Sequence, residues 1–235
     1  GEWSARLGLA GRPAVAEELA VGREIALARL TGASIHLQQV STAGAVALIR
    51  AAKAEAVPVT AEVSPHHLVL TEAVLAGFDP TTKLDPPLRT EADVVALRAA
   101  VADGTIDAIA TAHAPHTVDA VERPFDAAPF GAIGLETALA ALLTESGLGL
   151  EQLLPALSWQ PASIAGIADR HGTEIAEGSP ANLTVVDPDA TWTVEPARFG
   201  GYAANSPLTG RELRGRVRHT VRSGEPVVVD GEAIR

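Results

Sequence analysis

The chain repeatedly alternates a short, largely apolar run with an amphipathic helical run, and this alternation limits the possible folds more than any other feature. Apolar residues spaced by three and four predict the helices, and short apolar runs between turn residues predict the strands. The predicted helices cover 13–31, 43–56, 90–101 and 134–146, and the predicted strands cover 34–40, 57–63 and 106–111. This order predicts parallel β/α units and an α/β fold.

The ends of these helices carry recognisable signals. Gly32 is predicted to stop the first helix, and Ser41 or Thr42 to cap the second. Thr90 is the predicted N-cap of the third helix. Three strands cannot close an eight-stranded barrel by themselves.

The sequence changes character after about residue 172, where Gly, Pro and Asp turns separate short β runs. These runs lie at 181–186, 191–194, 216–221 and 227–229, and they predict an antiparallel β segment. A short helix at 158–167 is predicted to bridge the two parts. We therefore expect a β/α part over 1–172 and a small β part over 173–235.

The net charge of −11 over 235 residues argues against a nucleic-acid or anionic membrane partner. Five arginines at 211–222 form the one basic cluster, which alternates with apolar residues and is interpreted as a solvated strand edge. The chain has no cysteine, so any metal must be held by His, Asp or Glu. No apolar run reaches the length of a membrane span, and a cytoplasmic protein is expected.

Histidines follow two predicted strands, where barrel enzymes place their catalytic groups. His113 and His116 come after the strand at 106–111, and such a pair could bind a metal, an anionic substrate or nothing. His66 and His67 follow the strand at 57–63, and an extended chain would turn at most one of them into a shared site. We expect a hydrogen-bonding role in a loop for this second pair.

Further candidates lie within a strand and in two loops. Gln39 is predicted to point into the barrel from the end of its strand, while His36 faces the helices as a packing residue. Asp85 precedes two prolines that hold its loop extended, although turn chemistry explains Asp-Pro-Pro equally well. The 128–131 segment could bring backbone amides to a substrate.

Several of these segments, in the same order along the chain, resemble dihydroorotase of the cyclic amidohydrolase superfamily. The matching motifs are GRPAVAEELAV (11–21), IHLQQVSTAGAV (35–46), VTAEVSPHHLVLT (59–71), LDPPLRT (84–90), DAIATAHAPH (107–116) and APFGAIGLETAL (128–139). The resemblance implies the C-terminal part of a TIM-like barrel of the metal-dependent hydrolase type, followed by a small β-sandwich segment. It also implies that the chain starts after the fifth barrel strand, with further zinc ligands upstream.

Three positions depart from the family pattern. Gln39 stands where the family has a histidine that ligates zinc, and Ala112 stands where it has an aspartate that serves as ligand and general base. Asp85 replaces an asparagine that contacts the substrate. The resemblance also implies substrate contacts for His116, which helps bind a carboxylate, and for the backbone of Phe130 and Gly131.

The family reaction interconverts dihydroorotate and N-carbamoyl-L-aspartate in pyrimidine biosynthesis, with a metal-activated hydroxide and a carboxylate that moves protons. Because an amide is a poor zinc ligand and alanine is none, Gln39 and Ala112 argue against zinc binding and predict impaired catalysis. The resemblance leaves two alternatives open. One is a non-catalytic subunit that scaffolds aspartate transcarbamoylase, and the other is an active enzyme completed by upstream residues. A small-molecule substrate and a homo-oligomeric full-length protein are also implied.

Overall fold

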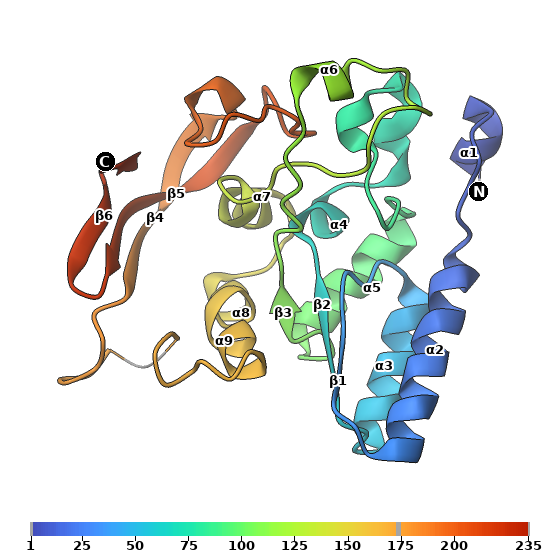
Figure 1. Ribbon diagram of the computed structural model, residues 1–235, viewed down its shortest axis with the longest axis horizontal. Coiled ribbons are helices and arrows are strands. Elements are labelled where there is room, and N and C mark those ends of the chain that lie inside the picture. Colours follow the sequence, from blue (N-terminus) through green and yellow to red (C-terminus); the bar gives the residue numbers. More distant parts are fainter. Residues whose placement is uncertain (1, 173–174, 235) are drawn as a thin grey trace.

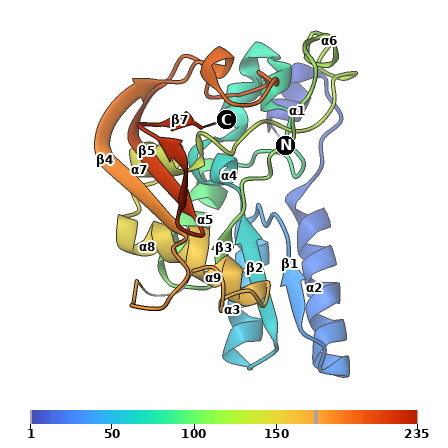
Figure 2. The ribbon, with the colours of Figure 1, turned by 60° about the vertical axis from the view of Figure 1, so that its left-hand side comes forward.

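The computed structural model describes residues 2–172 and 175–234, which form a β/α part and an antiparallel β part (Figure 1). Figures 1 and 2 show the antiparallel sheet on one side of the molecule and helices α2 (Ala14–Thr31) and α3 (Ala43–Ala54) on the other. The predicted boundary at residues 172/173 adjoins residues 173–174, which lie outside the described residues, and it stays a prediction.

Three parallel strands form the sheet of the β/α part, in the order β1-β2-β3. They are β1 (Ile35–Leu37), β2 (Val59–Val63) and β3 (Ala108–Ile109). β1 and β2 pair with Ile35 opposite Val59, and β2 and β3 pair with Val63 opposite Ile109. All three strands are found where the sequence predicts them, although each is shorter than predicted.

Helices α2, α3 and α5 (Glu91–Ala102) begin and end at the predicted signals. Gly32 ends α2 with a φ of 72°, a left-handed conformation that glycine adopts without strain. The Thr42 side chain accepts a hydrogen bond from the Ala45 amide at the start of α3. Thr90 and Asp93 form a capping box on α5.

The main core lies between the sheet and these helices. It contains Ile25 of α2, Ile49 of α3, Leu97 of α5 and the alternate β2 residues Val59, Ala61 and Val63. Because side chains alternate along a strand, Thr60 and Glu62 point to the opposite face. The helices therefore fix which face of each strand is apolar.

The predicted orientation of His36 is wrong. Its Nδ1 lies 2.8 Å from Thr60 Oγ1 and its Nε2 lies 3.0 Å from Glu62 Oε2, on the face of the sheet away from the helices. The flanking Leu37 is buried in the core. The apolar residues of β1 thus pack on the helices, and His36 takes the inner, more polar face.

Shorter elements that the sequence did not predict complete the loops. They are α1 (Glu2–Leu7), α4 (Pro65–Val69), η1 (Glu72–Gly77), η2 (Pro80–Thr82), α6 (Val118–Val121) and η4 (Pro196–Arg198). Of these, α4 matters most here because it begins directly after β2. Its cap, Ser64, accepts a hydrogen bond from the His67 amide.

The chain between the two parts is mostly helical. Helix α7 (Ala138–Glu145) occupies the C-terminal part of the predicted helix at 134–146 and starts four residues later than predicted. The short helix predicted at 158–167 is the end of a longer helical segment made of α8 (Leu150–Leu154), η3 (Pro155–Trp159) and α9 (Gln160–Ile164). Leu142 of α7 and Leu153 of α8 are fully buried in the main core.

The β part is one antiparallel sheet in the order β4-β5-β6-β7, with no second sheet among the described residues. Its strands are β4 (Leu183–Thr193), β5 (Glu212–Arg222), β6 (Glu225–Val229) and β7 (Glu232–Ala233). The runs predicted at 181–186 and 191–194 belong to the single strand β4, which has a bulge between Asp187 and Thr191. Leu213 of β5 packs with α7 residues Ala140 and Ala141 in a second core cluster.

The prediction of a solvated strand edge for the arginine-rich segment is wrong, because β5 pairs with both β4 and β6. Arg211 donates to Glu145 at 2.9 Å and Arg218 donates to Asp230 at 3.0 Å. These acidic partners offset the local positive charge. Within the described residues, no helix combines the length and apolar character needed to cross a membrane.

Candidate functional site

The two positions that replace family zinc ligands both follow strands of the sheet and share an unusual backbone conformation. Gln39 follows β1 with a φ of 53°, and Ala112 follows β3 with a φ of 49°. Non-glycine residues enter this left-handed region at a free-energy cost, and such residues concentrate at functional sites. The backbone therefore keeps a geometry suited to presenting side chains, although Ala112 has only a methyl group to present.

Helix α4 brings both of its histidines to the same place. His66 and His67 are 2% and 3% exposed, and both line the pocket at the carboxyl ends of the strands. The prediction that at most one would enter a shared site is wrong. It assumed an extended chain with opposed neighbours, whereas Ser64 starts a helix, in which successive side chains are only about 100° apart.

The two imidazoles differ in their hydrogen bonding. His67 uses both ring nitrogens, with Nδ1 2.8 Å from Ser64 Oγ and Nε2 3.0 Å from the Pro86 carbonyl oxygen. His66 Nε2 has no hydrogen-bond partner among the described residues. Burial, helped by the adjacent His67, lowers the pKa of His66 to about 4. Burial also lowers the pKa of His67, so both rings are neutral at pH 7.

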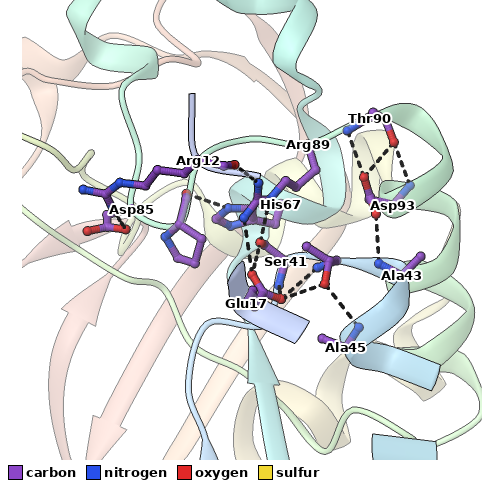
Figure 3. A network of polar contacts seen from close by, with 12 residues as sticks. Arg12, Glu17, Ser41, Ala43, Ala45, His67, Asp85, Arg89, Thr90 and Asp93 are labelled. Carbon is purple, nitrogen blue, oxygen red and sulfur yellow. Dashed lines mark hydrogen bonds and ion pairs between the residues drawn. The ribbon is translucent and has the colours of Figure 1, made fainter. Parts of the chain in front are cut away.

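Asp85 lies at the rim of the pocket and is paired with a cation. Arg12 Nη1 donates to Asp85 Oδ1 at 2.6 Å (Figure 3). The Arg12 guanidinium also lies 4.8 Å from the centre of the Phe130 ring. Both side chains of the ion pair are about half exposed. The sequence motif GRP gave no signal for this role of Arg12, which compensates the charge introduced by Asp85.

A polar network binds the backbone of Arg12 (Figure 3). Arg89 Nη1 donates to the Arg12 carbonyl oxygen at 2.7 Å, and Arg89 Nε donates to Ser41 Oγ at 3.0 Å. Glu17 accepts from the backbone amides of Ser41 and Thr42 at 2.8 and 3.0 Å, at the start of α3. A carboxylate at a helix N-terminus is stabilised by the helix dipole, so this network is rigid scaffolding for the rim.

The loop after β3 is tied to the 128–134 segment. His116 Nε2 lies 2.8 Å from the Phe130 carbonyl oxygen, so this ring nitrogen is occupied. Asn205 donates to the carbonyl oxygens of Ala114 and Gly131 at 2.8 and 3.1 Å, and accepts from the His116 amide at 3.1 Å. Asn205 was missed because it lies in the β part, far from these loops in the sequence.

Gly131 is required where these loops meet. Its φ is 122°, and a β-carbon there would lie 2.4 Å from the Ala114 β-carbon. His113 stands on the far side of the same loop, where its Nδ1 accepts from the Gly134 amide at 3.2 Å. His113 therefore supports the turn into α7 and does not line the pocket at the strand ends.

These elements enclose a pocket of about 100 Å³. It is lined by Gln39, Ser64, His66, His67, Leu84, Asp85, Ala112, Ala114, Phe130 and Gly131. The structure thus brings together five of the six predicted site positions, and the sixth, His116, binds the Phe130 carbonyl just outside the lining. The functional roles assigned to them stay predictions.

The side chains that this chain contributes to the pocket do not fit a zinc site. No group of three or more His, Asp or Glu residues with metal-binding geometry occurs in the described part of the chain. At the family positions there is a neutral amide at Gln39 and a methyl group at Ala112, and imidazole or carboxylate donors are what zinc prefers. These side chains do not supply the donor set for the zinc that the family resemblance implies.

Comparisons with known proteins agree with the fold. Residues 7–227 match the amidohydrolase family. The chain is 46% identical to the dihydroorotase of Streptomyces coelicolor over 97% of its own length and 54% of that protein, and 47% identical to the dihydroorotase of Pelotomaculum thermopropionicum over 97% and 53%. It therefore spans about half the length of these relatives.

Solved structures give the same result. An L-hydantoinase (dihydropyrimidinase) from Arthrobacter aurescens superposes with a TM-score of 0.89 at 30% identity, covering 95% of this chain and 51% of that one. A dihydropyrimidinase from Brevibacillus agri gives 0.86 at 28% identity, covering 95% and 50%. The predicted barrel-type hydrolase fold is confirmed at this level, whereas a β-sandwich is not. The chain belongs to the amidohydrolase family, and it is similar to dihydroorotases along nearly its whole length.

Proposed function

We propose that this chain is a dihydroorotase-like protein of pyrimidine biosynthesis in which hydrolysis of the cyclic amide is impaired. The observation that carries this proposal is the meeting of Gln39, Asp85 and Ala112 in one pocket at the strand ends. All three depart from the family pattern. Changes scattered over the surface would not affect the chemistry, but these three line the same 100 Å³.

The pocket retains features suited to holding a small ligand. The Phe130–Gly131 backbone lies against it and is fixed by Asn205 and by His116. Arg12 neutralises Asp85, so the rim does not carry an uncompensated negative charge. Binding of a small cyclic amide is therefore compatible with the site.

What the pocket lacks is a group that could move protons during hydrolysis. Ala112 has none, Asp85 is engaged by Arg12, and His67 has both ring nitrogens occupied. Burial lowers the pKa of His66 to about 4, so this ring is a weak base. Losing a general base alone lowers the rate by roughly 10²- to 10⁴-fold.

The test is a dihydroorotate hydrolysis assay on the protein as its gene encodes it, with and without added zinc. We expect no turnover above background from the unmodified protein and a measurable rate from the Gln39→His/Ala112→Asp double variant. Aspartate tolerates the left-handed backbone at position 112. Turnover by the unmodified protein at the rate of an ordinary enzyme would refute the proposal.

A matched control is Gln38→His/Ala114→Asp, which places the same side chains one and two residues away. Gln38 is exposed and Ala114 lines the pocket without being a family ligand position. This control should stay inactive. Equal activation of both double variants would show that the gain depends on added charge and not on the two positions.

The scaffold role that the resemblance implies remains a further proposal. It predicts that the protein co-purifies with aspartate transcarbamoylase at a fixed ratio and that the complex survives Ala112→Asp. Failure of the two purified proteins to associate in analytical ultracentrifugation would exclude that role.

A further inference from the structure

One atom in the pocket has an unmet hydrogen-bonding requirement. His66 is 2% exposed, and its Nε2 has no partner within the part of the chain that the structure describes. More than nine in ten buried polar groups in proteins are paired, because an unpaired one costs about 1–3 kcal/mol. The ring lines the 100 Å³ pocket, so a ligand held there would lie beside it.

The hydrogen bonds around His66 determine what kind of ligand could satisfy this nitrogen. The backbone of Ile133 makes a hydrogen bond to the imidazole. The Ile133 amide already donates to the Asn205 carbonyl oxygen at 3.0 Å, so the Ile133 carbonyl is the group that accepts from His66. Since Nε2 is unpaired, Nδ1 carries the proton. Nε2 therefore presents a bare lone pair, which accepts but does not donate.

Within the described residues, none of the groups around the pocket, including the Gln39 amide, donates a hydrogen bond to Nε2. Ser64 Oγ and both nitrogens of His67 are already engaged with each other or with the Pro86 carbonyl. Ala112 and Ala114 offer only methyl groups. A 100 Å³ pocket exceeds the roughly 30 Å³ that one water molecule occupies in the liquid, so there is room for a small planar group.

We propose that His66 Nε2 accepts a hydrogen bond from a ring N–H of a cyclic amide or ureide bound in this pocket. An ionised carboxylate or phosphate has no proton to donate and would repel the lone pair, whereas an amide N–H matches it. This inference rests on the proposed function, and it assigns His66 a role in recognition and not in catalysis. It also explains why a neutral, buried imidazole is compatible with a pocket that has lost its hydrolytic groups.

The test uses hydantoin, a cyclic ureide with two ring N–H groups, and 1,3-dimethylhydantoin, which has none. Binding to the protein as its gene encodes it is measured by calorimetry and by nitrogen-15 NMR of histidine-labelled protein. We expect hydantoin to bind at least tenfold more tightly than the dimethyl compound and to shift the His66 Nε2 resonance. In His66→Leu, hydantoin should lose that tenfold advantage.

The variant also separates hydrogen bonding from the size of the methyl groups. If crowding alone weakened the dimethyl compound, His66→Leu would still discriminate between the two ligands, and that result would overturn the inference. His66→Gln keeps an acceptor oxygen and should recover part of the affinity, which guards against misfolding of the leucine variant. An unmoved Nε2 resonance at saturating hydantoin would likewise overturn it.

Failure of this inference can be told apart from failure of the proposed function. If the unmodified protein neither binds hydantoin nor turns over dihydroorotate, only the role of His66 is contradicted. Turnover of dihydroorotate by the unmodified protein contradicts the proposed function, whereas a shifted Nε2 resonance in that same protein would still support recognition by His66.

Discussion

The two ends of the parallel sheet differ in how completely their polar groups are paired. At the amino-terminal end, Asp107 accepts from Lys53 Nζ at 2.7 Å and from the Ala61 amide at 2.8 Å. Lys53 also donates to the Gly104 carbonyl oxygen at 3.1 Å. At the carboxyl end, His66 Nε2 is unpaired and Ala112 has a left-handed backbone.

This difference corresponds to the two faces of a barrel fold. In barrel folds the amino-terminal face contributes stability and the carboxyl-terminal face contributes the active site. The ion pair of Lys53 and Asp107 lies at the amino-terminal end, and both of its side chains are mostly buried. At the carboxyl end, Gln39 and Ala112 have positive φ values, a conformation that concentrates at functional sites, and their side chains are an amide and a methyl group.

The largest effect should come from a substitution at the amino-terminal end of the sheet, where the polar groups are paired. We expect Asp107→Ala to lower the free energy of unfolding by about 3 kcal/mol, because it leaves the Lys53 ammonium without its carboxylate and the Ala61 amide unpaired. Urea denaturation at pH 7.5 measures this. Arg50→Ala is the control, since the Arg50–Asp103 pair is about half exposed and should contribute less than about 1 kcal/mol. Equal losses in the two variants would contradict the contrast.

The second effect is a loss of stability in mild acid that originates at His66, at the carboxyl end of the sheet. The pKa of His66 is about 4 in the folded protein and about 6.5 in the unfolded chain, so lowering the pH below 6.5 protonates the unfolded state first. The stability that His66 contributes is therefore present above pH 6.5 and is lost as the pH falls toward 4. Between pH 7 and 5 we expect a loss of about 2 kcal/mol.

Urea denaturation of the unmodified protein and of His66→Leu at pH 7 and pH 5 measures the His66 part. The leucine variant should lose about 2 kcal/mol less than the unmodified protein between these pH values. His113→Leu is the comparator, because it replaces an exposed histidine that does not line the pocket. Identical pH dependence in His66→Leu and the unmodified protein would contradict the burial of a neutral ring.

A smaller effect, of opposite sign, is expected at Ala112. Ala112→Gly should raise the free energy of unfolding by about 1 kcal/mol, because glycine adopts a positive φ without the steric cost that alanine incurs. Ala114→Gly is the matched control, since this neighbouring alanine has no positive φ and should gain nothing. Thermal denaturation of both variants measures the difference. Destabilisation by Ala112→Gly would show that the left-handed conformation is not strained.

The smallest effect is expected at the rim. Arg12→Ala removes an ion pair with Asp85 whose side chains are about half exposed, and such pairs contribute about 0.5 kcal/mol. The loss should shrink further in 1 M salt, where exposed charges are screened. Denaturation at low and high salt measures it. A salt-independent loss above 2 kcal/mol would mean that Arg12 acts through packing on Phe130 instead.

The sequence predicts those features that depend on local signals. Gly32 and the Thr90 capping box act within a few residues, and both helix ends are confirmed. His36 was assigned to the wrong face because the direction of a side chain on a short strand depends on which face the helices cover. Both His66 and His67 enter the pocket because a helix begins at Pro65, which the extended-strand interpretation did not anticipate.

The candidate site shows the same division. The motifs place Gln39, Asp85 and Ala112 correctly in one pocket, because the order of strands and loops is fixed by the fold. Arg12 and Asn205 could not be predicted, since each reaches the site through a contact between segments more than 70 residues apart. Long-range pairing of this kind leaves no periodic pattern in a single sequence.

The central claim of the proposed function is that Gln39 and Ala112 do not support zinc binding in this amidohydrolase-type chain. The most direct measurement is the zinc content of the protein as its gene encodes it, determined by mass spectrometry after dialysis against micromolar zinc. We predict well under one zinc ion per chain for the unmodified protein and a higher content for Gln39→His/Ala112→Asp. One or more tightly held zinc ions per unmodified chain, together with turnover of dihydroorotate, would contradict the account.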